Sequence, residues 1–277
     1  MLDVNHVTFG YKRSVNVLED FSLSISSGSV YGLLGKNGVG KSTLLYLMTG
    51  LLRAREGNII YRGVDVCRRL PETLADLFLL PEEITLPNVT LKQYARMYGV
   101  FYPRFSQEEL MRLSDELDID ANVRLHSFSM GQRKKAYICF AIATNVSLLL
   151  MDEPTNGLDI PSKSQFRKLL ASYATDERTI VISTHQVRDL ESLLDHLIVM
   201  DGKKLLLNES VARITERLCF DEVRPGESIE QTLVAYPSLG GSQVVSLNTS
   251  RRETAFNLEC FFNALLEHRE QIMNALK

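Results

Sequence analysis

The feature that most constrains this chain is a glycine-rich segment at residues 35–43. It fits the pattern G-x-x-x-x-G-K-[ST] at every fixed position, and apolar residues precede and follow it. In this context the pattern predicts a strand, a tight loop and a helix whose backbone N–H groups surround a polyphosphate. Lys41 is expected to reach the β- and γ-phosphates and to act in catalysis, and the Ser42 hydroxyl to bind Mg²⁺. The residues predicted to bind nucleotide here are Gly35, Lys36, Asn37, Gly38, Val39, Gly40, Lys41, Ser42 and Thr43.

Two carboxylates, Asp152 and Glu153, follow a second apolar segment at residues 148–151. A continuous apolar run indicates a strand buried on both faces, as in a parallel sheet, and ligands bind at the carboxyl ends of such strands. Asp152 is expected to accept hydrogen bonds from the Mg²⁺ shell, and Glu153 to polarise a water molecule. Two acids after a core strand also occur in ordinary loops, but the phosphate loop upstream favours the functional interpretation.

Two further motifs indicate phosphate chemistry. A predicted strand at residues 179–184 ends in His185, which at a carboxyl end is placed to contact a γ-phosphate or to position the attacking water. Ser129 is a predicted N-cap, and Ser129 with Gly131 at a helix start forms a second anion site, because N–H groups and a hydroxyl converge there. One chain therefore carries two predicted phosphate-binding devices.

With these motifs in this order, the chain resembles the nucleotide-binding subunit of an ABC (ATP-binding cassette) transporter over roughly residues 1–210. His185 matches the switch histidine of that family, and Tyr11 matches the aromatic residue that stacks on adenine. The other matching motifs are Walker A at 35–43, the signature loop at 128–132, Walker B at 148–153 and the D-loop at 156–159.

The resemblance implies ATP and Mg²⁺ as cofactors and hydrolysis of ATP, with Glu153, His185 and Lys41 as catalytic residues. It also implies a head-to-tail dimer, either a homodimer or a heterodimer with a second cassette, that buries two ATP molecules. The signature loop of one subunit then closes on the ATP held by the other. The residues expected to act across the dimer are Ser129, Gly131, Gln132 and Asp159.

Two departures from the family pattern affect these expectations. In the signature loop Phe128 and Met130 replace the usual leucine and first glycine, while Ser129 and Gly131 are kept, so closure is expected to survive with Met130 turned away from the phosphate. Glu82 stands near the position of the usual Q-loop glutamine. A carboxylate can ligate Mg²⁺ or its water, so Glu82 is a third candidate metal ligand, although it adds negative charge beside a triphosphate.

The expected fold class is α/β, a P-loop ABC cassette with a mainly parallel sheet, an antiparallel β portion and a helical subdomain at about residues 85–128. The cassette is expected to span residues 1–209. Residues 210–277 are expected to form a small α+β appendage that contains a strand at 244–247 and one amphipathic helix at 258–276. Tyr98, Phe101 and Tyr102 are candidates for the border of a groove that receives a membrane subunit, or are simply core aromatics. The run Arg133-Lys134-Lys135 is expected to be a solvated helix face.

Composition excludes several other classes of protein. The net charge of −3 gives no basic field for nucleic acid, and the four cysteines, at 67, 139, 219 and 260, lack the spacing of a metal site or disulfide framework. No signal peptide and no run of 18 apolar residues is expected. Together with the resemblance to ABC transporters, this composition leads to the expectation of a peripheral protein on the cytoplasmic face of the membrane. The resemblance implies that it is bound to a transmembrane permease and not to nucleic acid.

Two alternatives to a transport ATPase remain at this point. One is a soluble ABC ATPase that acts on ribosomes or DNA, although such proteins usually carry two cassettes or a long coiled coil. The other is an ATP-dependent regulator with weakened hydrolysis, which Met130 and Glu82 favour and Glu153 and His185 oppose. The departures at Met130 and Glu82 also resemble the exporter branch of the family, whose ATPase is encoded apart from its membrane subunit.

Overall fold

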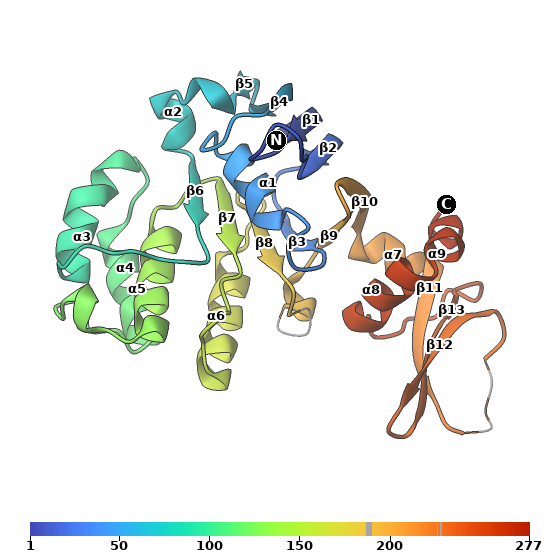
Figure 1. The fold of residues 1–277 in the computed structure, drawn as a ribbon. Coiled ribbons are helices and arrows are strands. Elements are labelled where there is room, and N and C mark those ends of the chain that lie inside the picture. The colour runs from blue at the N-terminus through green and yellow to red at the C-terminus, as the bar shows by residue number, and fades with distance from the viewer. Residues whose placement is uncertain (187–189, 226, 228) are drawn as a thin grey trace.

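The computed structural model describes residues 1–186, 190–225, 227 and 229–277 (Figure 1). Its centre is a sheet with the strand order β10-β9-β3-β8-β7-β6, in which β10 is antiparallel to β9 and the other neighbours are parallel. The strands of this sheet are β3 (Val30–Leu34), β6 (Leu77–Leu80), β7 (Leu148–Asp152), β8 (Thr179–Thr184), β9 (His196–Asp201) and β10 (Lys204–Ser210). The predicted parallel α/β core is confirmed.

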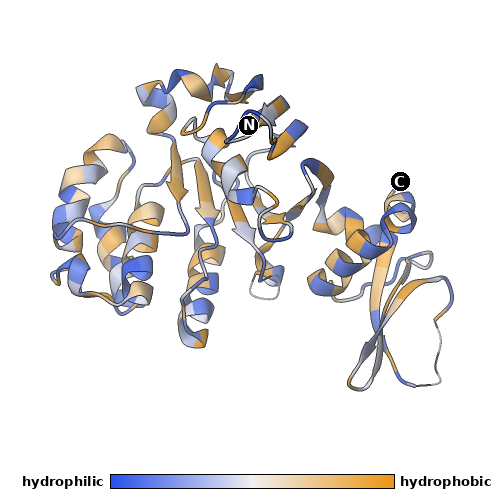
Figure 2. Cartoon of the chain, viewed as in Figure 1, coloured by the Kyte–Doolittle hydropathy of each residue, from blue (hydrophilic) through white to orange (hydrophobic). Residues whose placement is uncertain are grey.

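The central strands are buried on both faces, as their continuous apolar runs predict. Side chains alternate along β7, so Leu149 and Met151 join one hydrophobic core while Leu148 and Leu150 join another. Figure 2 shows these strands in the hydrophobic colours. The sheet therefore separates two cores, and the loops at its carboxyl edge are held from both sides.

An antiparallel sheet with the order β2-β1-β4-β5 packs on the second core together with α1 (Lys41–Met48). Its strands are β1 (Leu2–Phe9), β2 (Leu18–Ile25), β4 (Glu56–Tyr61) and β5 (Val64–Asp65), followed by η1 (Val66–Arg68) and α2 (Pro71–Leu74). Hydrogen bonds join it to the central sheet: Glu19 N–H donates to the Lys203 carbonyl at 3.1 Å, Lys203 Nζ donates to the Glu19 carboxylate at 3.5 Å, and Asn208 Nδ2 donates to the Ser24 carbonyl at 3.1 Å.

A group of helices lies beyond the β6 edge of the central sheet (Figure 1). It comprises α3 (Leu91–Tyr98), η2 (Gly99–Phe101), α4 (Gln107–Glu116), η3 (Leu125–Ser127) and α5 (Met130–Ala143). The helices predicted from the apolar spacing at 91–98 and 110–117 are thus both present. An aromatic cluster around Phe140 fixes α5 to α3 and β6, with ring centroids 4.9 Å away at Tyr94 and 5.9 Å away at Phe78.

The C-terminal part is more structured than the sequence indicated. Beyond α6 (Ile160–Tyr173) and η5 (Glu191–Leu193) in the cassette come α7 (Val211–Arg217) and a sheet of order β11-β13-β12, covered by two helices (Figure 1). These elements are β11 (Leu218–Val223), β12 (Thr232–Ser238), β13 (Gly241–Leu247), α8 (Leu258–Glu267) and α9 (Arg269–Ala275). The single helix predicted at 258–276 is wrong, because His268, at φ −123° and ψ 43°, leaves helical geometry. Both α8 and α9 nevertheless have one apolar face, so the helical spacing of apolar residues continues past His268.

The domain division at residue 209 stays a prediction. Strand β10 ends at Ser210 and α7 begins at Val211, while the core that surrounds Phe261 continues into the cassette. In the part of the chain that the structure describes, no helix is long and apolar enough to cross a membrane.

We expect Phe261→Ala to destabilise the protein by about 3–5 kcal/mol, because the change leaves a cavity where a fully buried ring stood. Urea unfolding followed by circular dichroism measures the change. Leu239→Ala is the control: Leu239 lies at the exposed β12–β13 tip, and its loss is expected to shift the free energy of unfolding by less than about 0.5 kcal/mol. Equal effects of the two changes would contradict the packing described for α8.

Candidate functional site

The glycine loop joins β3 to α1 in the way its pattern predicts. Gly40, immediately before the helix, has φ 109°, and a Cβ there would lie 2.8 Å from Val17 Cγ1, so only glycine fits without a shift. Gly38, at φ 79°, faces open space. No side chain caps α1, which leaves its first N–H groups directed to the loop. This arrangement suits an anion.

Lys41 begins α1 and folds back over the loop. Its Nζ donates to the Gly35 carbonyl at 2.8 Å and to the Lys36 carbonyl at 3.4 Å, and the side chain is 7% exposed. Burial lowers the pKa of Lys41, while the carboxylates of Glu153, Asp152 and Glu82 oppose that effect. The loop is therefore closed by an ammonium group that faces three carboxylates.

The two carboxylates after β7 differ in their surroundings. Asp152 is almost fully buried and accepts a hydrogen bond from Ser183 Oγ on β8. Glu153 has a left-handed backbone, with φ 44°, and its N–H donates to both the carbonyl and the Oγ of Ser183 at 3.1 Å. A residue other than glycine keeps this backbone conformation only where neighbouring groups hold it in place. Ser183 thus fixes both acids through the adjacent strand.

His185, the first residue after β8, pairs with Glu153. Its Nδ1 lies 2.8 Å from Glu153 Oε1, and its side chain is 38% exposed. The other oxygen, Glu153 Oε2, is buried and has no hydrogen-bond partner among the described residues. A buried carboxylate oxygen without a partner is costly unless something else fills that place. It is available for a water molecule or a substrate group.

These groups surround one open cavity of about 360 Å³. Most residues predicted to bind nucleotide or to act in catalysis line this cavity. Gly35, Lys36, Val39 and Asp152 do not line it; the first three belong to the glycine loop, and Asp152 ends β7. The lining residues are Tyr11, Val17, Asn37, Gly38, Gly40, Lys41, Ser42, Thr43, Glu82, Glu153 and His185. We call this the phosphate pocket.

Tyr11 stands at the rim of the phosphate pocket with 64% of its surface exposed. Its hydroxyl lies 3.2 Å from Thr43 Oγ1, and its ring meets Phe9 edge-on with centroids 5.1 Å apart. The exposed ring suits stacking by a flat ligand. Val17, opposite Gly40, is a lining residue that the sequence analysis missed, since a single apolar residue in a loop carries no signal.

Glu82 connects the pocket to the segment after Glu153. Its Oε1 accepts a hydrogen bond from Asn156 Nδ2 at 2.9 Å, and Asn156 Oδ1 accepts one from Gln186 Nε2 at 3.2 Å. Segments that follow β6, β7 and β8 are therefore joined in one chain of bonds. Glu82 faces the phosphate pocket on one side and a second cavity, of about 550 Å³, on the other.

The signature residues do not border the phosphate pocket of their own chain. Ser129 caps α5 by accepting from Gln132 N–H at 3.2 Å, and Gln132 Oε1 accepts from Ser129 N–H at 3.0 Å. Met130 is 72% exposed and lies over Gly157, whose added Cβ would come within 2.7 Å of its Cε. Asp159 caps α6 by accepting from Ser162 N–H at 2.9 Å. Hydrogen bonding to the hydroxyl and the N–H of Ser162 lowers the pKa of its carboxyl. The capping predicted at Ser129 is confirmed.

The expectation of a solvated Arg133-Lys134-Lys135 face is wrong at its centre. Lys134 is 4% exposed, and its Nζ donates to the carbonyls of Glu153 at 2.6 Å and Asn156 at 3.2 Å. Helical spacing gives the signal that was missed, because Lys134 shares a face with the fully buried Ile138 and Ala141.

The oxygen ligands in this region fit Mg²⁺. The described residues hold no cluster of three His, Cys, Asp or Glu side chains able to cage a metal. Mg²⁺ usually takes one or two protein oxygens and completes its shell with water and substrate phosphate. The Ser42 hydroxyl in the first turn of α1 and the Asp152 carboxylate at the end of β7 are such oxygens, on two elements that pack together.

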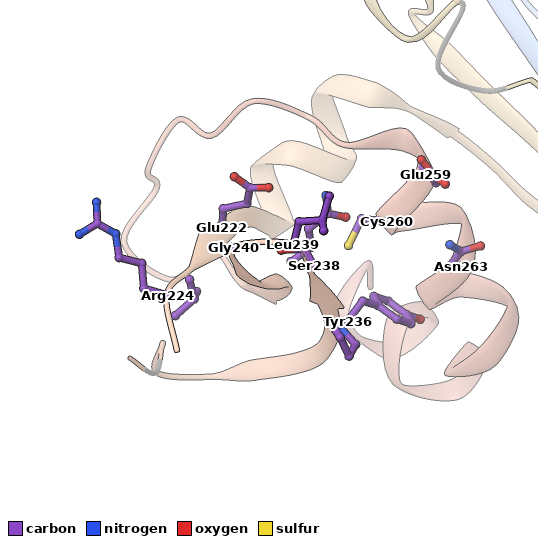
Figure 3. A pocket seen from close by; sticks show the side chains of 12 residues that line it. Glu222, Arg224, Tyr236, Ser238, Leu239, Gly240, Glu259, Cys260 and Asn263 are labelled. Carbon is purple, nitrogen blue, oxygen red and sulfur yellow. The ribbon is translucent and has the colours of Figure 1, made fainter. Parts of the chain in front are cut away.

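A larger cavity, of about 860 Å³, lies in the C-terminal part (Figure 3). Residues of β11, the β12–β13 hairpin and the start of α8 surround it, including Tyr236, Leu239 and Cys260. Burial raises the pKa of the Cys260 thiol to about 11, which disfavours the thiolate form at neutral pH. This cavity shares no lining residue with the phosphate pocket.

Comparison with known proteins agrees with the site. A family model described as ABC transporter matches residues 18–156, which is half of the chain. The ABC transporter ATP-binding protein NatA of Bacillus subtilis (strain 168) is 29% identical over 74% of this chain and 86% of its own length. The arabinose import ATP-binding protein AraG 2 of Burkholderia ambifaria is 30% identical over 88% of this chain but 49% of its own length.

A solved structure described as an ATP binding subunit of an ABC transporter superposes with a TM-score of 0.70. It is 25% identical, and the match covers 77% of this chain and 91% of that one. The chain therefore belongs to the ABC transporter family, as an ATP-binding cassette of a family of ATPases.

Proposed function

We propose that this protein binds and hydrolyses ATP to drive transport through a separately encoded membrane subunit. The observation that carries the proposal is the phosphate pocket, where an uncapped helix start, Lys41 and the Glu153–His185 pair face one cavity. Each of these groups matches a need of phosphoryl transfer: donors for the phosphate oxygens, a cation, and a carboxylate for the water.

The proposed reaction uses Glu153 to orient and deprotonate a water molecule. The water oxygen bonds to the γ-phosphorus as the bond to the β–γ bridging oxygen breaks, which yields ADP and phosphate, and the proton passes to Glu153. His185 holds the carboxylate through the 2.8 Å contact with Oε1, which leaves Oε2 for the water. Lys41 and the N–H groups of the loop take the charge that develops on the γ-phosphate oxygens. Mg²⁺, when bound to Ser42 and Asp152, neutralises part of the triphosphate charge.

A head-to-tail dimer accounts for the signature residues. Ser129, Gly131 and Asp159 lie outside the phosphate pocket of their own chain, so a second copy or a second cassette is needed to bring such groups to the same ATP. Met130 and Ile160, which are 72% and 84% exposed, lie directly beside them. Apolar side chains this exposed next to functional groups are typical of an interface.

An apolar surface on the helical subdomain fits the membrane partner. Met97, Tyr98, Val100 and Phe101 at the α3–η2 corner are 50%, 37%, 74% and 65% exposed. Tyr102 packs inward against Phe78, with centroids 5.6 Å apart, and so is a core residue. We assign this corner, rather than Tyr102, to a cytoplasmic segment of the membrane subunit. The proposal therefore includes a location on the cytoplasmic face of the membrane.

We infer export as the direction, on the resemblance of the Met130 and Glu82 departures to the exporter branch. The family relative AraG 2 is named as an import protein, so family membership leaves the direction open. Transport assays in vesicles that contain the membrane partner, with ATP on either side, distinguish the two directions.

Glu153→Gln is expected to lower kcat by about 10² to 10⁴-fold, because the amide cannot accept the proton of the attacking water. ATP affinity and ATP-driven dimerisation are expected to persist. Phosphate release measures turnover, and size-exclusion chromatography with ATP measures the dimer.

Glu72→Gln, a change of an exposed glutamate on α2, is the matched control and should leave turnover unchanged. Rapid hydrolysis by the Glu153→Gln protein would contradict the role of Glu153 as the base for the attacking water. A wild-type protein that binds ATP without turnover would favour the regulator alternative.

The proposed membrane contact predicts that Phe101→Ser weakens assembly with the permease by about tenfold or more while ATP binding stays normal, since an exposed aromatic residue is a typical interface anchor. Purification of the tagged Glu153→Gln protein from detergent-solubilised host membranes with ATP, with and without Phe101→Ser, measures recovery of a multi-span protein. Leu51→Ser, at a residue 57% exposed in the segment that follows α1, is the control. Recovery only with ribosomes or DNA would support the soluble alternative.

A further inference from the structure

The feature with no assigned role in this site is the ammonium group of Lys134. It belongs to the first turns of α5, the helix capped by Ser129, and it is almost fully withdrawn from solvent. A lysine is rarely buried in this way unless its charge is paired or hydrogen-bonded. Its two carbonyl partners therefore identify what it stabilises.

Both partners lie in the turn that follows β7. The Glu153 carbonyl accepts from Lys134 Nζ at 2.6 Å and from Asn156 N–H at 3.2 Å, which closes the turn, and the Asn156 carbonyl accepts from Nζ at 3.2 Å. One ammonium group thus holds both ends of a four-residue turn.

The turn is strained at the residue that matters for chemistry. Glu153 is in the left-handed region at φ 44°, where a residue with a Cβ is unfavourable unless its surroundings fix it. Ser183 fixes its N–H side, and Lys134 fixes its carbonyl side. The direction of the Cα–Cβ bond, and hence of the carboxylate, depends on these two anchors.

We propose that Lys134 is a positioning residue for hydrolysis, which holds the backbone of Glu153 so that its carboxylate faces the phosphate pocket. Lys134 does not line that pocket, so it acts through Glu153 and not on the substrate. A displacement of about 1 Å at a reacting group costs about 10²-fold in rate.

The same contact joins two sites of the proposed dimer, and this step rests on the proposed function. Ser129 and Lys134 belong to one helix, so the helix whose start would meet the partner's ATP also bonds to the glutamate that serves the chain's own ATP. Movement of the signature helix is thereby transmitted to Glu153 by a hydrogen bond and not only by packing.

The charges around Lys134 fit this role. Burial lowers its pKa, while the carboxylates of Glu82, Glu153 and Asp152 oppose that effect. Its side chain also borders the second cavity, beside Glu82 and Asn156.

The test compares two variants. Lys134→Met keeps about the same side-chain length but has no hydrogen-bond donor, whereas Lys134→Arg keeps hydrogen-bond donors and the positive charge. In the full chain, Lys134→Met is expected to lower kcat by about 10- to 100-fold while KM for ATP stays within about threefold. Lys134→Arg is expected to recover part of the loss. The thermal midpoint and the affinity for a fluorescent ATP analogue are measured on every variant, so that kcat refers to molecules that bind ATP.

Lys135→Met is the matched control. Lys135 is the next residue and donates from Nζ to the Leu117 carbonyl at 3.1 Å, away from the turn, so its kcat should stay within twofold of wild type. The proposal is overturned if Lys134→Met keeps the wild-type kcat, if Lys135→Met loses as much, or if Lys134→Met loses only ATP affinity. Should Lys134→Met fail to fold, Lys134→Gln, which is shorter and polar, takes its place under the same criteria. If the wild type does not hydrolyse ATP at all, the proposed ATPase function is wrong, and the role of Lys134 in hydrolysis is wrong with it.

Discussion

The parallel pairing of β3, β8 and β7 is the constraint on which the site depends. Leu34 pairs with Thr184, and Asp152 pairs with Ser183, so the three strands end almost level at one edge of the sheet. The next residues in each chain segment are Gly35, His185 and Glu153. A shift of one residue in either pairing would turn every side chain of that strand to the other face and separate Glu153 from His185. The continuous burial of these strands in two cores makes such a shift costly.

Electrostatics adds a second constraint at the same edge. Two buried ammonium groups, on Lys41 and Lys134, both lie in the field of Glu153, Asp152 and Glu82. The carboxylates outnumber the ammonium groups, so a polyphosphate enters more favourably with a divalent cation of its own. The carboxylate of Glu82 strengthens that requirement. In the structure Asn156 donates to Glu82, which offsets part of the added charge by a hydrogen bond.

The sequence allowed the cassette to be predicted well because each of its motifs is local. The loop at 35–43, the apolar strands and the Ser129 cap each depend on residues within one turn or one strand, and the structure confirms those elements. Lys134 could not be placed in the same way, because its partners lie 19 and 22 residues away in the chain. Of the C-terminal sheet, the strand predicted at 244–247 is present within β13, whereas β11 and β12 were missed. In β11 three buried residues come first, followed by half-buried Asp221, exposed Glu222 and buried Val223, so the segment lacks the alternation that marks a strand.

The C-terminal part is bonded to the segment that follows β8, and this limits how freely either can move. The Glu191 carboxylate, in η5, accepts a hydrogen bond from Leu258 N–H at the start of α8 at 2.8 Å. Val211 N–H, at the start of α7, donates to the Asp195 carbonyl at 2.8 Å, and the carboxylate of Asp195 accepts from Val30 N–H at the start of β3. The same strand β3 leads to the glycine loop, and β8 leads to His185. Two separate bonds therefore tie the C-terminal part to the cassette, one from α8 to η5 and one from α7 to the residue before β9.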